Sequence, residues 1–150
     1  MSEKLTHVDE SSGSVQMVDV GHKPPMKRVA TARGAVLMAP ETARRLHDLP
    51  KGDALTTAQL AGIMGGKTTS TLIPLCHPLP LSSVEVQLEV GDGRVDITAR
   101  AKVTGQTGVE MEALTAVAVA ALTVYDMAKA IDKGMQITGI TLVEKTKEDL

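Results

Sequence analysis

Two consecutive stretches of alternating apolar and polar residues constrain the fold of this chain more than any other feature. From Val84 to Val90, and again from Val95 to Val103, apolar side chains occupy every second position, with charged or polar residues between them. Successive side chains of a strand point to opposite faces, so each stretch predicts a strand with one buried, apolar face and one solvent-exposed, polar face. Gly91-Asp92-Gly93 separates them, which predicts an antiparallel hairpin packed on one side only.

Other elements flank this hairpin. Before it, a strand is followed by two helices, the second after Asp53, whose side chain is a good N-cap. After it, the segment from Thr107 to Glu110 has the spacing of a capping box and predicts a long helix that ends at Lys133, before Gly134. The other expected ranges are 29–38 for the first strand, 41–49 and 54–64 for the first two helices, 135–143 for the last strand and 144–150 for a charged tail.

The resulting order β-α-(α)-β-β-α-β predicts an α+β fold. It matches the ferredoxin-like βαββαβ arrangement, an antiparallel sheet with helices on one face, plus one extra helix. Residues 26–150 form the expected single domain. Residues 1–25 are mostly charged or small and polar, and they predict a flexible N-terminal arm.

Composition argues against several classes of protein. Lys and Arg number 16 against 18 Asp and Glu, and Tyr125 is the only Phe, Tyr or Trp, which disfavours a nucleic-acid binder. Cys76 is the only cysteine, so neither an internal disulfide nor a Cys-rich zinc site is expected. No signal peptide is evident, and the longest apolar run, residues 113–125, is too short to span a bilayer. We therefore expect a soluble, cytoplasmic protein without membrane contact.

The long helix also bears on assembly. Residues 113–125 are apolar on almost every side of the expected helix, whereas packing against one sheet face requires only one apolar stripe. The additional apolar surface suggests a subunit interface. The alternative is that the first two helices cover it. Glu112 and Asp126 are fourteen residues apart, which is about 21 Å along a helix axis. They cannot act on one small molecule within a subunit, whereas two such helices antiparallel across a two-fold axis would bring them together between subunits.

Three local patterns suggest chemistry. Three prolines between Leu72 and Pro80 would hold Cys76 and His77 in a rigid, extended loop, where His77 can exchange a hydrogen bond or a proton with a ligand. Their side chains should point apart, so a Cys–His nucleophile pair is not expected. The alternative for this loop is a rigid connector with a buried Cys and a hydrogen-bonded His.

Charged residues near two helix ends give the other two patterns. Lys51 lies in a turn just before a helix, a position suited to an anion, and Asp126 and Lys129 share a helix face as a plausible proton-transfer pair. The alternatives are an exposed lysine and a surface ion pair. The segment from Ala61 to Thr68 resembles a loosened phosphate-binding loop, but a helix is expected before it in place of a strand, which indicates a chance match.

Four segments together resemble the MoaC family, the cyclic pyranopterin monophosphate synthases of molybdenum cofactor biosynthesis. The resemblance covers nearly the whole chain, and its two longest motifs are specific to that family. Gly65 and Gly66 replace residues that are often Ala in the family, which predicts a looser helix there. The four segments are residues 51–53 (KGD), 72–79 (LIPLCHPL), 107–116 (TGVEMEALTA) and 125–130 (YDMAKA). Two arm segments, residues 5–9 (LTHVD) and 17–20 (MVDV), also resemble the family.

The resemblance implies a lyase that converts 3′,8-cyclo-7,8-dihydro-GTP to cyclic pyranopterin monophosphate and releases pyrophosphate. It implies a ferredoxin-like subunit and a homohexamer, a trimer of dimers with active sites between subunits. Asp126 and Lys129 would be the acid–base pair, with Lys51 as a further catalytic residue. Substrate-binding segments would be Leu75, Cys76 and His77 together with Met111 and Glu112.

The expected substrate sets further requirements. A triphosphate carries roughly four negative charges, for which Lys51, Lys67 and Arg28 are candidate cations. No tightly bound cofactor is expected and no metal-ligand spacing is visible, so Mg²⁺ would arrive with the triphosphate. Two other classes stay open on the residues alone: a phosphate-loop nucleotide kinase or hydrolase resting on Lys67 and Thr68, and a non-catalytic oligomeric binding module.

Overall fold

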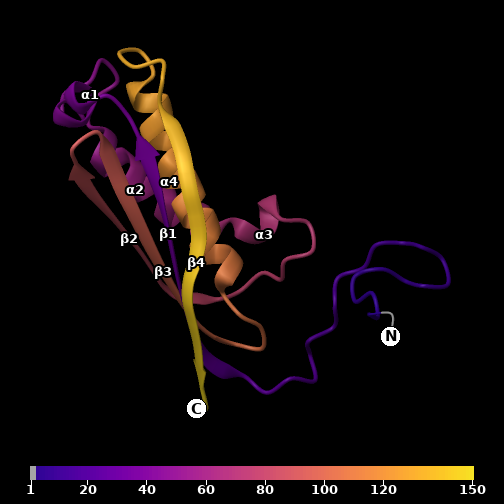
Figure 1. The fold of residues 1–150 in the computed structure, drawn as a ribbon. Helices are drawn as coiled ribbons and strands as arrows, with labels where there is room; N and C mark the ends of the chain where they lie inside the picture. The colour runs from indigo at the N-terminus through magenta and orange to yellow at the C-terminus, as the bar shows by residue number, and fades with distance from the viewer. Residues whose placement is uncertain (1–2) are drawn as a thin grey trace.

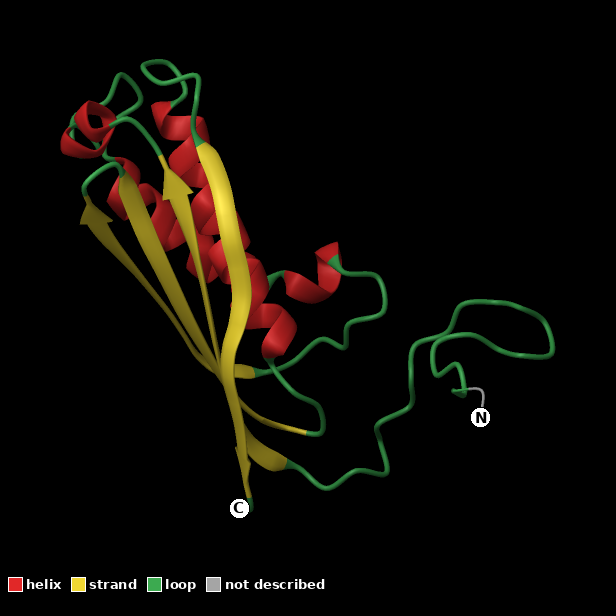
Figure 2. Ribbon diagram, viewed as in Figure 1, coloured by secondary structure: helices red, strands yellow, loops and turns green. Residues whose placement is uncertain are grey.

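A computed structural model describes residues 3–150 as one four-stranded antiparallel sheet with its helices on one face (Figures 1 and 2). The strand order is β2-β3-β1-β4, which is that of a ferredoxin-like fold, so the predicted fold class is confirmed. The strands are β1 (Met26–Leu37), β2 (Leu81–Gly91), β3 (Arg94–Gly105) and β4 (Gln136–Glu148). The helices are α1 (Pro40–Arg44), α2 (Ala54–Lys67), α3 (Thr69–Leu72) and α4 (Glu110–Ala128).

The predicted hairpin is confirmed as β2 and β3. In β3 every second side chain from Val95 to Val103 is buried, while the residues between them are mostly exposed. β3 and β1 are the two central strands, and β1 contributes Ala30, Ala32 and Val36 to the same buried face. The buried, apolar face therefore extends across the centre of the sheet, where α4 and α2 cover it (Figure 2).

Small side chains bring α2 and α4 close together. A Cβ at Gly65 would lie 2.7 Å from Cγ2 of Val119, and one at Gly62 would lie 3.0 Å from the carbonyl oxygen of Ala116. The glycine pair at 65 and 66 therefore does not end α2, which continues to Lys67. Its role is to let the helix backbones approach each other.

Several predicted boundaries were wrong. α1 has only five residues, and α3 begins before the proline-rich loop. α4 begins at Glu110 with Val109 as N-cap, and within residues 3–150 no side chain caps its first turn, so the expected capping box does not form. α4 ends at Ala128 because the chain turns over residues 129–134, where the Asp132 carboxylate accepts hydrogen bonds from the backbone N–H groups of Ala39 and Gly134.

The charged end of the chain belongs to the sheet. β4 continues to Glu148, where it pairs with Lys27 of β1, in place of the tail expected after residue 143. Main-chain hydrogen bonds to β1 hold this edge strand, and its charged side chains remain in water, so their charge does not oppose pairing. The extension places Lys145 and Lys147 opposite Ala30 and Arg28, respectively.

α4 is the one helix of the described chain that is long and apolar enough to cross a membrane. It instead lies between the sheet and α2, with most of its apolar residues buried in the core, so no membrane is indicated. α2 packs against α4 and covers apolar surface that the sheet leaves open. This is the alternative to a subunit interface that was given above. Leu122 stays 60% exposed on the remaining side.

Candidate active site

The C-terminal end of α4 carries a carboxylate between two ammonium groups. Oδ2 of Asp126 lies 3.0 Å from Nζ of Lys51, and Oδ1 lies 2.9 Å from Nζ of Lys129. The hydrogen bonds from Lys129 and then Lys51 hold the pKa of the Asp126 carboxyl below its usual value. All three side chains are about half exposed, so a ligand from solvent can reach this Asp126 cluster (Lys51, Asp126, Lys129).

The sequence explains how the Asp126 cluster forms. Asp53 caps α2 by accepting hydrogen bonds from the backbone N–H groups of Leu55 and Thr56, as predicted. Gly52, with a φ of +114°, makes the tight turn just before this cap, so Lys51 is held at the start of α2. Because α2 and α4 pack together along their length, the start of α2 meets the end of α4.

The N-terminal end of α4 buries a carboxyl group. Glu112 is only 3% exposed; Oε2 accepts a hydrogen bond from the Cys76 thiol at 3.8 Å, while Oε1 has no partner among the described residues. Burial raises the pKa of Glu112 above its ordinary value. Burial, followed by the charge of Glu112, raises the pKa of Cys76 to about 11, so its thiol is not a nucleophile at neutral pH.

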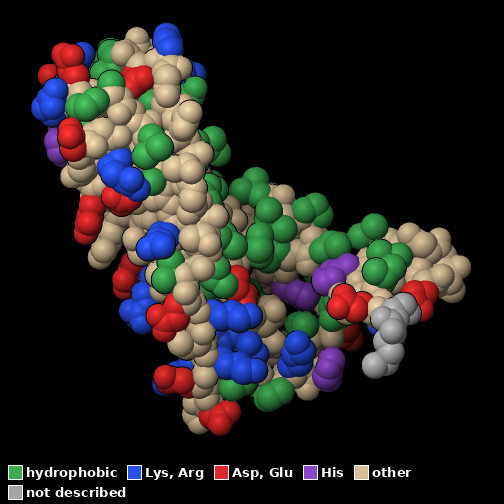
Figure 3. All heavy atoms as spheres, viewed as in Figure 1, with side chains coloured by type: hydrophobic (Ala, Val, Ile, Leu, Met, Phe, Trp, Pro, Cys, Tyr) green, Lys and Arg blue, Asp and Glu red, His purple; other side chains and the backbone are tan. Residues whose placement is uncertain are grey.

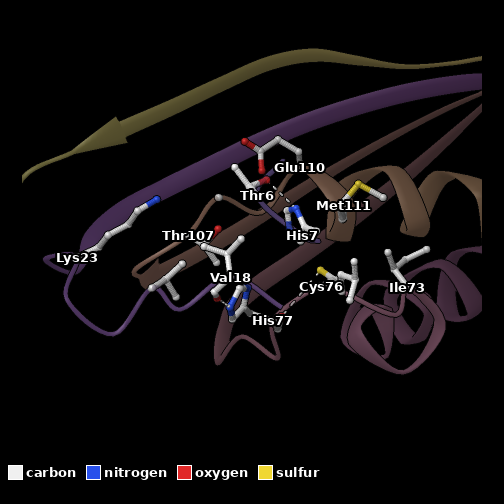
Figure 4. A pocket seen from close by; sticks show the side chains of 13 residues that line it. Thr6, His7, Val18, Lys23, Ile73, Cys76, His77, Thr107, Glu110 and Met111 are labelled. Atoms are coloured by element: carbon white, nitrogen blue, oxygen red, sulfur yellow. Dashed lines mark hydrogen bonds between the residues drawn. The ribbon is translucent and has the colours of Figure 1, made fainter. Parts of the chain in front are cut away.

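Cys76 and His77 point to different partners. The thiol faces Glu112, whereas Nε2 of His77 hydrogen-bonds the backbone carbonyl of Val18 at 2.5 Å (Figure 4). The two residues therefore do not form a nucleophile pair. Cys76 fixes a carboxyl on α4, and His77 fixes the N-terminal arm.

An open pocket of about 690 Å³ lies between the arm, the proline-rich loop and the start of α4. Figure 4 shows side chains from these three segments turned toward one another. We call this space the arm pocket. Its lining residues are Thr6, His7, Val18, Val20 and Lys23 from the arm; Ile73, Leu75, Cys76 and His77 from the loop; and Thr107, Gly108, Glu110 and Met111 at the start of α4.

A smaller cavity of about 230 Å³, the cationic cavity, adjoins the same helix end. Arg28, Lys145 and Lys147 line it, and Nζ of Lys145 lies 3.2 Å from Oε1 of Glu110. Paired residues of neighbouring strands share a face, so Lys145, opposite the buried Ala30, lies on the helix side of the sheet. Figure 3 shows Lys and Arg side chains gathered beside the C-terminal half of β4.

The predicted site residues thus fall into two groups at opposite ends of α4. Lys51, Asp126 and Lys129 meet at its C-terminal end. Lys67 is exposed at the end of α2, next to Gly66, which lies close to the Glu112 backbone. The other group therefore lies near the N-terminal end and consists of Leu75, Cys76, His77, Met111, Glu112, Arg28 and Lys67.

Sequence reasoning missed several lining residues. Lys145 and Lys147 were assigned to a tail, although alternate lysines in a strand would place both on one face. His7 and Lys23 were assigned to a flexible arm that could order over bound substrate, and neither was named as a site residue. Across residues 3–150, no three His, Cys, Asp or Glu side chains come together as a metal site would require.

Comparison with known proteins adds independent findings. A model of the MoaC family matches residues 17–148. A cyclic pyranopterin monophosphate synthase from Streptomyces coelicolor is 56% identical over 146 residues, which cover 96% of this chain and 85% of the relative. The same-named proteins from Parvibaculum lavamentivorans (55% over 149 residues; 97% and 92%) and Roseiflexus sp. strain RS-1 (58% over 146 residues; 95% and 92%) are similarly close.

Proposed function

The chain belongs to the MoaC family of molybdenum cofactor biosynthesis, and from this we propose that it converts 3′,8-cyclo-7,8-dihydro-GTP to cyclic pyranopterin monophosphate and releases pyrophosphate. Its curated relatives are named cyclic pyranopterin monophosphate synthases, so the chain is an enzyme, a lyase. The observation that carries the proposal is the Asp126 cluster. A carboxylate held between two lysines can pass protons to and from a bound substrate.

The proposed reaction turns a purine ring into a pterin, which requires several proton transfers. Lys129 would donate a proton to a ring nitrogen or oxygen, and Asp126, ion-paired to it, would stabilise its ammonium form before transfer. Lys51 contacts the other oxygen of Asp126 and would keep that carboxylate ionised and oriented. This division of roles is consistent with the half-exposed positions of all three groups.

The opposite end of α4 supports binding of the rest of the substrate. The arm pocket offers apolar surface from Met111 and Ile73 for a base, and Glu112 lies behind it with one unpartnered oxygen suited to an N–H donor. The cationic cavity offers Arg28, Lys145 and Lys147 beside the N-terminus of a 19-residue helix. Both the cations and the helix dipole favour a triphosphate.

The separation of these regions supports an active site shared between subunits. Glu112 and Asp126 lie about 21 Å apart along α4, too far for one small molecule to contact both within a chain. We therefore propose that the arm pocket and cationic cavity of one subunit meet the Asp126 cluster of another. The assembly would be a homohexamer, a trimer of dimers, in the cytoplasm.

The proposal includes no tightly bound cofactor. Mg²⁺ would enter with the triphosphate, whose oxygens and water would complete its coordination. Dialysis against a chelator should therefore leave the apo protein folded, with an unchanged melting temperature.

The test mixes the purified protein with 3′,8-cyclo-7,8-dihydro-GTP and measures pyrophosphate, with plain GTP as the control. Pyrophosphate from the cyclised compound alone, and a fluorescent pterin after oxidation, would support the proposal. Release from neither compound would contradict it and favour a binding module. Phosphate from plain GTP would favour a phosphate-loop enzyme, although residues 61–67 lie inside α2 and form no such loop.

A further inference from the structure

We propose that the N-terminal arm supplies a ligand-contacting residue, His7, which reaches from the arm pocket to phosphate oxygens of the nucleotide. The triphosphate would lie in the adjoining cationic cavity, since Gly108 and Glu110 line both spaces. This inference rests on the proposed function for the identity of the ligand. It is carried by the place of the arm in the structure, because five arm residues, His7 among them, line the pocket. Without the arm, the pocket would be bounded only by the loop and the start of α4.

The arm has its own local structure, which fixes the position of His7. Val8 and Val15 form an antiparallel bridge, and the N–H of Gln16 donates to the carbonyl of His7 at 2.7 Å. Asp9 closes the connecting turn, since its carboxylate accepts hydrogen bonds from the backbone N–H groups of Ser11 and Ser12. Among these contacts His7 contributes only its main-chain carbonyl, so none of them uses its ring.

Within the described residues, two hydrogen bonds attach the arm to the catalytic domain. The ring of His77 bonds the carbonyl of Val18, and Nε2 of Gln106 donates to the carbonyl of Gly21 at 3.2 Å. Both contacts are to arm backbone, so they fix its path regardless of side-chain identity. His77 thus holds the segment that brings His7 to the pocket.

The ring chemistry of His7 indicates the class of ligand atom. Its Nδ1 lies 2.9 Å from Oγ1 of Thr6, and no described residue hydrogen-bonds its Nε2. When the Thr6 hydroxyl donates to Nδ1, Nε2 carries the hydrogen and donates to an oxygen of the ligand. Lys23 lines the same pocket and adds positive charge, which favours a phosphate oxygen over a carbonyl.

Binding is tested first by NMR, because the chain has only four histidines: His7, His22, His47 and His77. We expect GTP, used as a non-reacting stand-in, to shift the ring signals of His7, with those of His22 and His47 unchanged. A GTP response at His77 without one at His7 would overturn the inference while leaving the proposed function intact. No response at any histidine, with no GTP binding by calorimetry, would overturn the inference and contradict the proposed ligand class as well.

Kinetics on the cyclised substrate give the second test. His7→Ala should raise KM by about tenfold, the scale of one lost hydrogen bond to a charged group, with a smaller change in kcat. His7→Gln, which keeps an N–H donor, should restore part of the loss. His22→Ala is the matched control, an exposed arm histidine outside the pocket, and should match wild type. Equal KM values for His7→Ala and His22→Ala would overturn the inference.

Discussion

The Cys76 thiol donates a hydrogen bond to Glu112 across 3.8 Å and ties the proline-rich loop to the first turn of α4. The opposite oxygen of the same carboxyl is buried and lacks a partner within the described chain. A buried acceptor without a donor is costly, and proteins retain such groups mainly where a ligand or a partner completes them. The contact therefore gives Cys76 a structural role and leaves one oxygen of Glu112 for the binding role proposed above.

The first prediction concerns the reactivity of Cys76. Burial and the charge of Glu112 raise its pKa to about 11, so iodoacetamide should modify the folded protein slowly at pH 7 and rapidly only near pH 11. Glu112→Gln removes the neighbouring charge and should lower the midpoint, while burial keeps it above 9.0. A midpoint at or below 9.0 in the wild-type protein would contradict the assigned contact.

Glu112→Gln should also stabilise the folded subunit at neutral pH. Burial raises the folded-state pKa of Glu112 above its unfolded value of 4.5, so the folded state is penalised for ionising this group. The penalty is absent below pH 4.5 and grows as pH rises toward the folded-state pKa. Urea unfolding should show a gain of about 1 kcal/mol at pH 7 that disappears below pH 4.5. A gain that is independent of pH would rule out ionisation as the cause.

Lys129→Ala should abolish turnover without unfolding the protein. Its ammonium is half exposed and bonds only Asp126, so the melting temperature should stay near that of wild type, while kcat falls by about 10² or more. Lys133→Ala, an exposed lysine four residues further on, is the matched control and should retain full activity. Near-normal kcat in folded Lys129→Ala would remove Lys129 from the acid–base pair.

Two inactive variants should restore activity when they share one assembly. Glu112→Gln damages the N-terminal end of α4 and Lys129→Ala the C-terminal end, and the proposed site takes one end from each of two subunits. Co-expression of differently tagged copies should therefore yield mixed oligomers in which some sites are intact and active. Activity no higher than the sum of the two separate variants would place the whole site within one chain.

Gly65→Ala should destabilise the protein by about 1–3 kcal/mol, although alanine is the better helix former. The added Cβ would lie 2.7 Å from Cγ2 of Val119 and force α2 away from α4. Val119→Ala in the same chain opens the space, and the double variant should recover most of the loss in urea unfolding. Equal stability of Gly65→Ala and wild type would show that the two helices are not tightly packed there.

Regular local patterns in the sequence predicted most of the fold. The alternation in β3 and the Asp53 cap depend on neighbouring residues only, and both were confirmed. In β2 the alternation is weaker, because Val86 is buried whereas Val90 is 44% exposed. The glycine pair in α2 depends on a contact with Val119, more than fifty residues away, so its role could not be predicted locally. The end of β4 was missed for a similar reason. Its last residues are charged and, taken alone, indicate a tail, but pairing with β1 extends the strand through them.

The same distinction applies to the site. Asp126 and Lys129 are one helical turn apart, so their ion pair follows from helix geometry. Lys51 joins them only because α2 and α4 pack closely, and His7 reaches the pocket only through the path of the arm. Neither contact has a signature in nearby residues. The mobility of the arm and the roles of the predicted site residues stay predictions.

The near absence of aromatic side chains makes this protein almost transparent to optical spectroscopy. Tyr125 is its only fluorescent residue, and it sits half-buried on α4, next to Asp126. Emission excited at longer wavelengths would come from the oxidised pterin alone, so the product could be quantified after oxidation without a protein background. Tyr125 directly precedes Asp126 in the chain, so a change in tyrosine emission would report on the surroundings of the proposed proton-transfer pair. No added label would be needed.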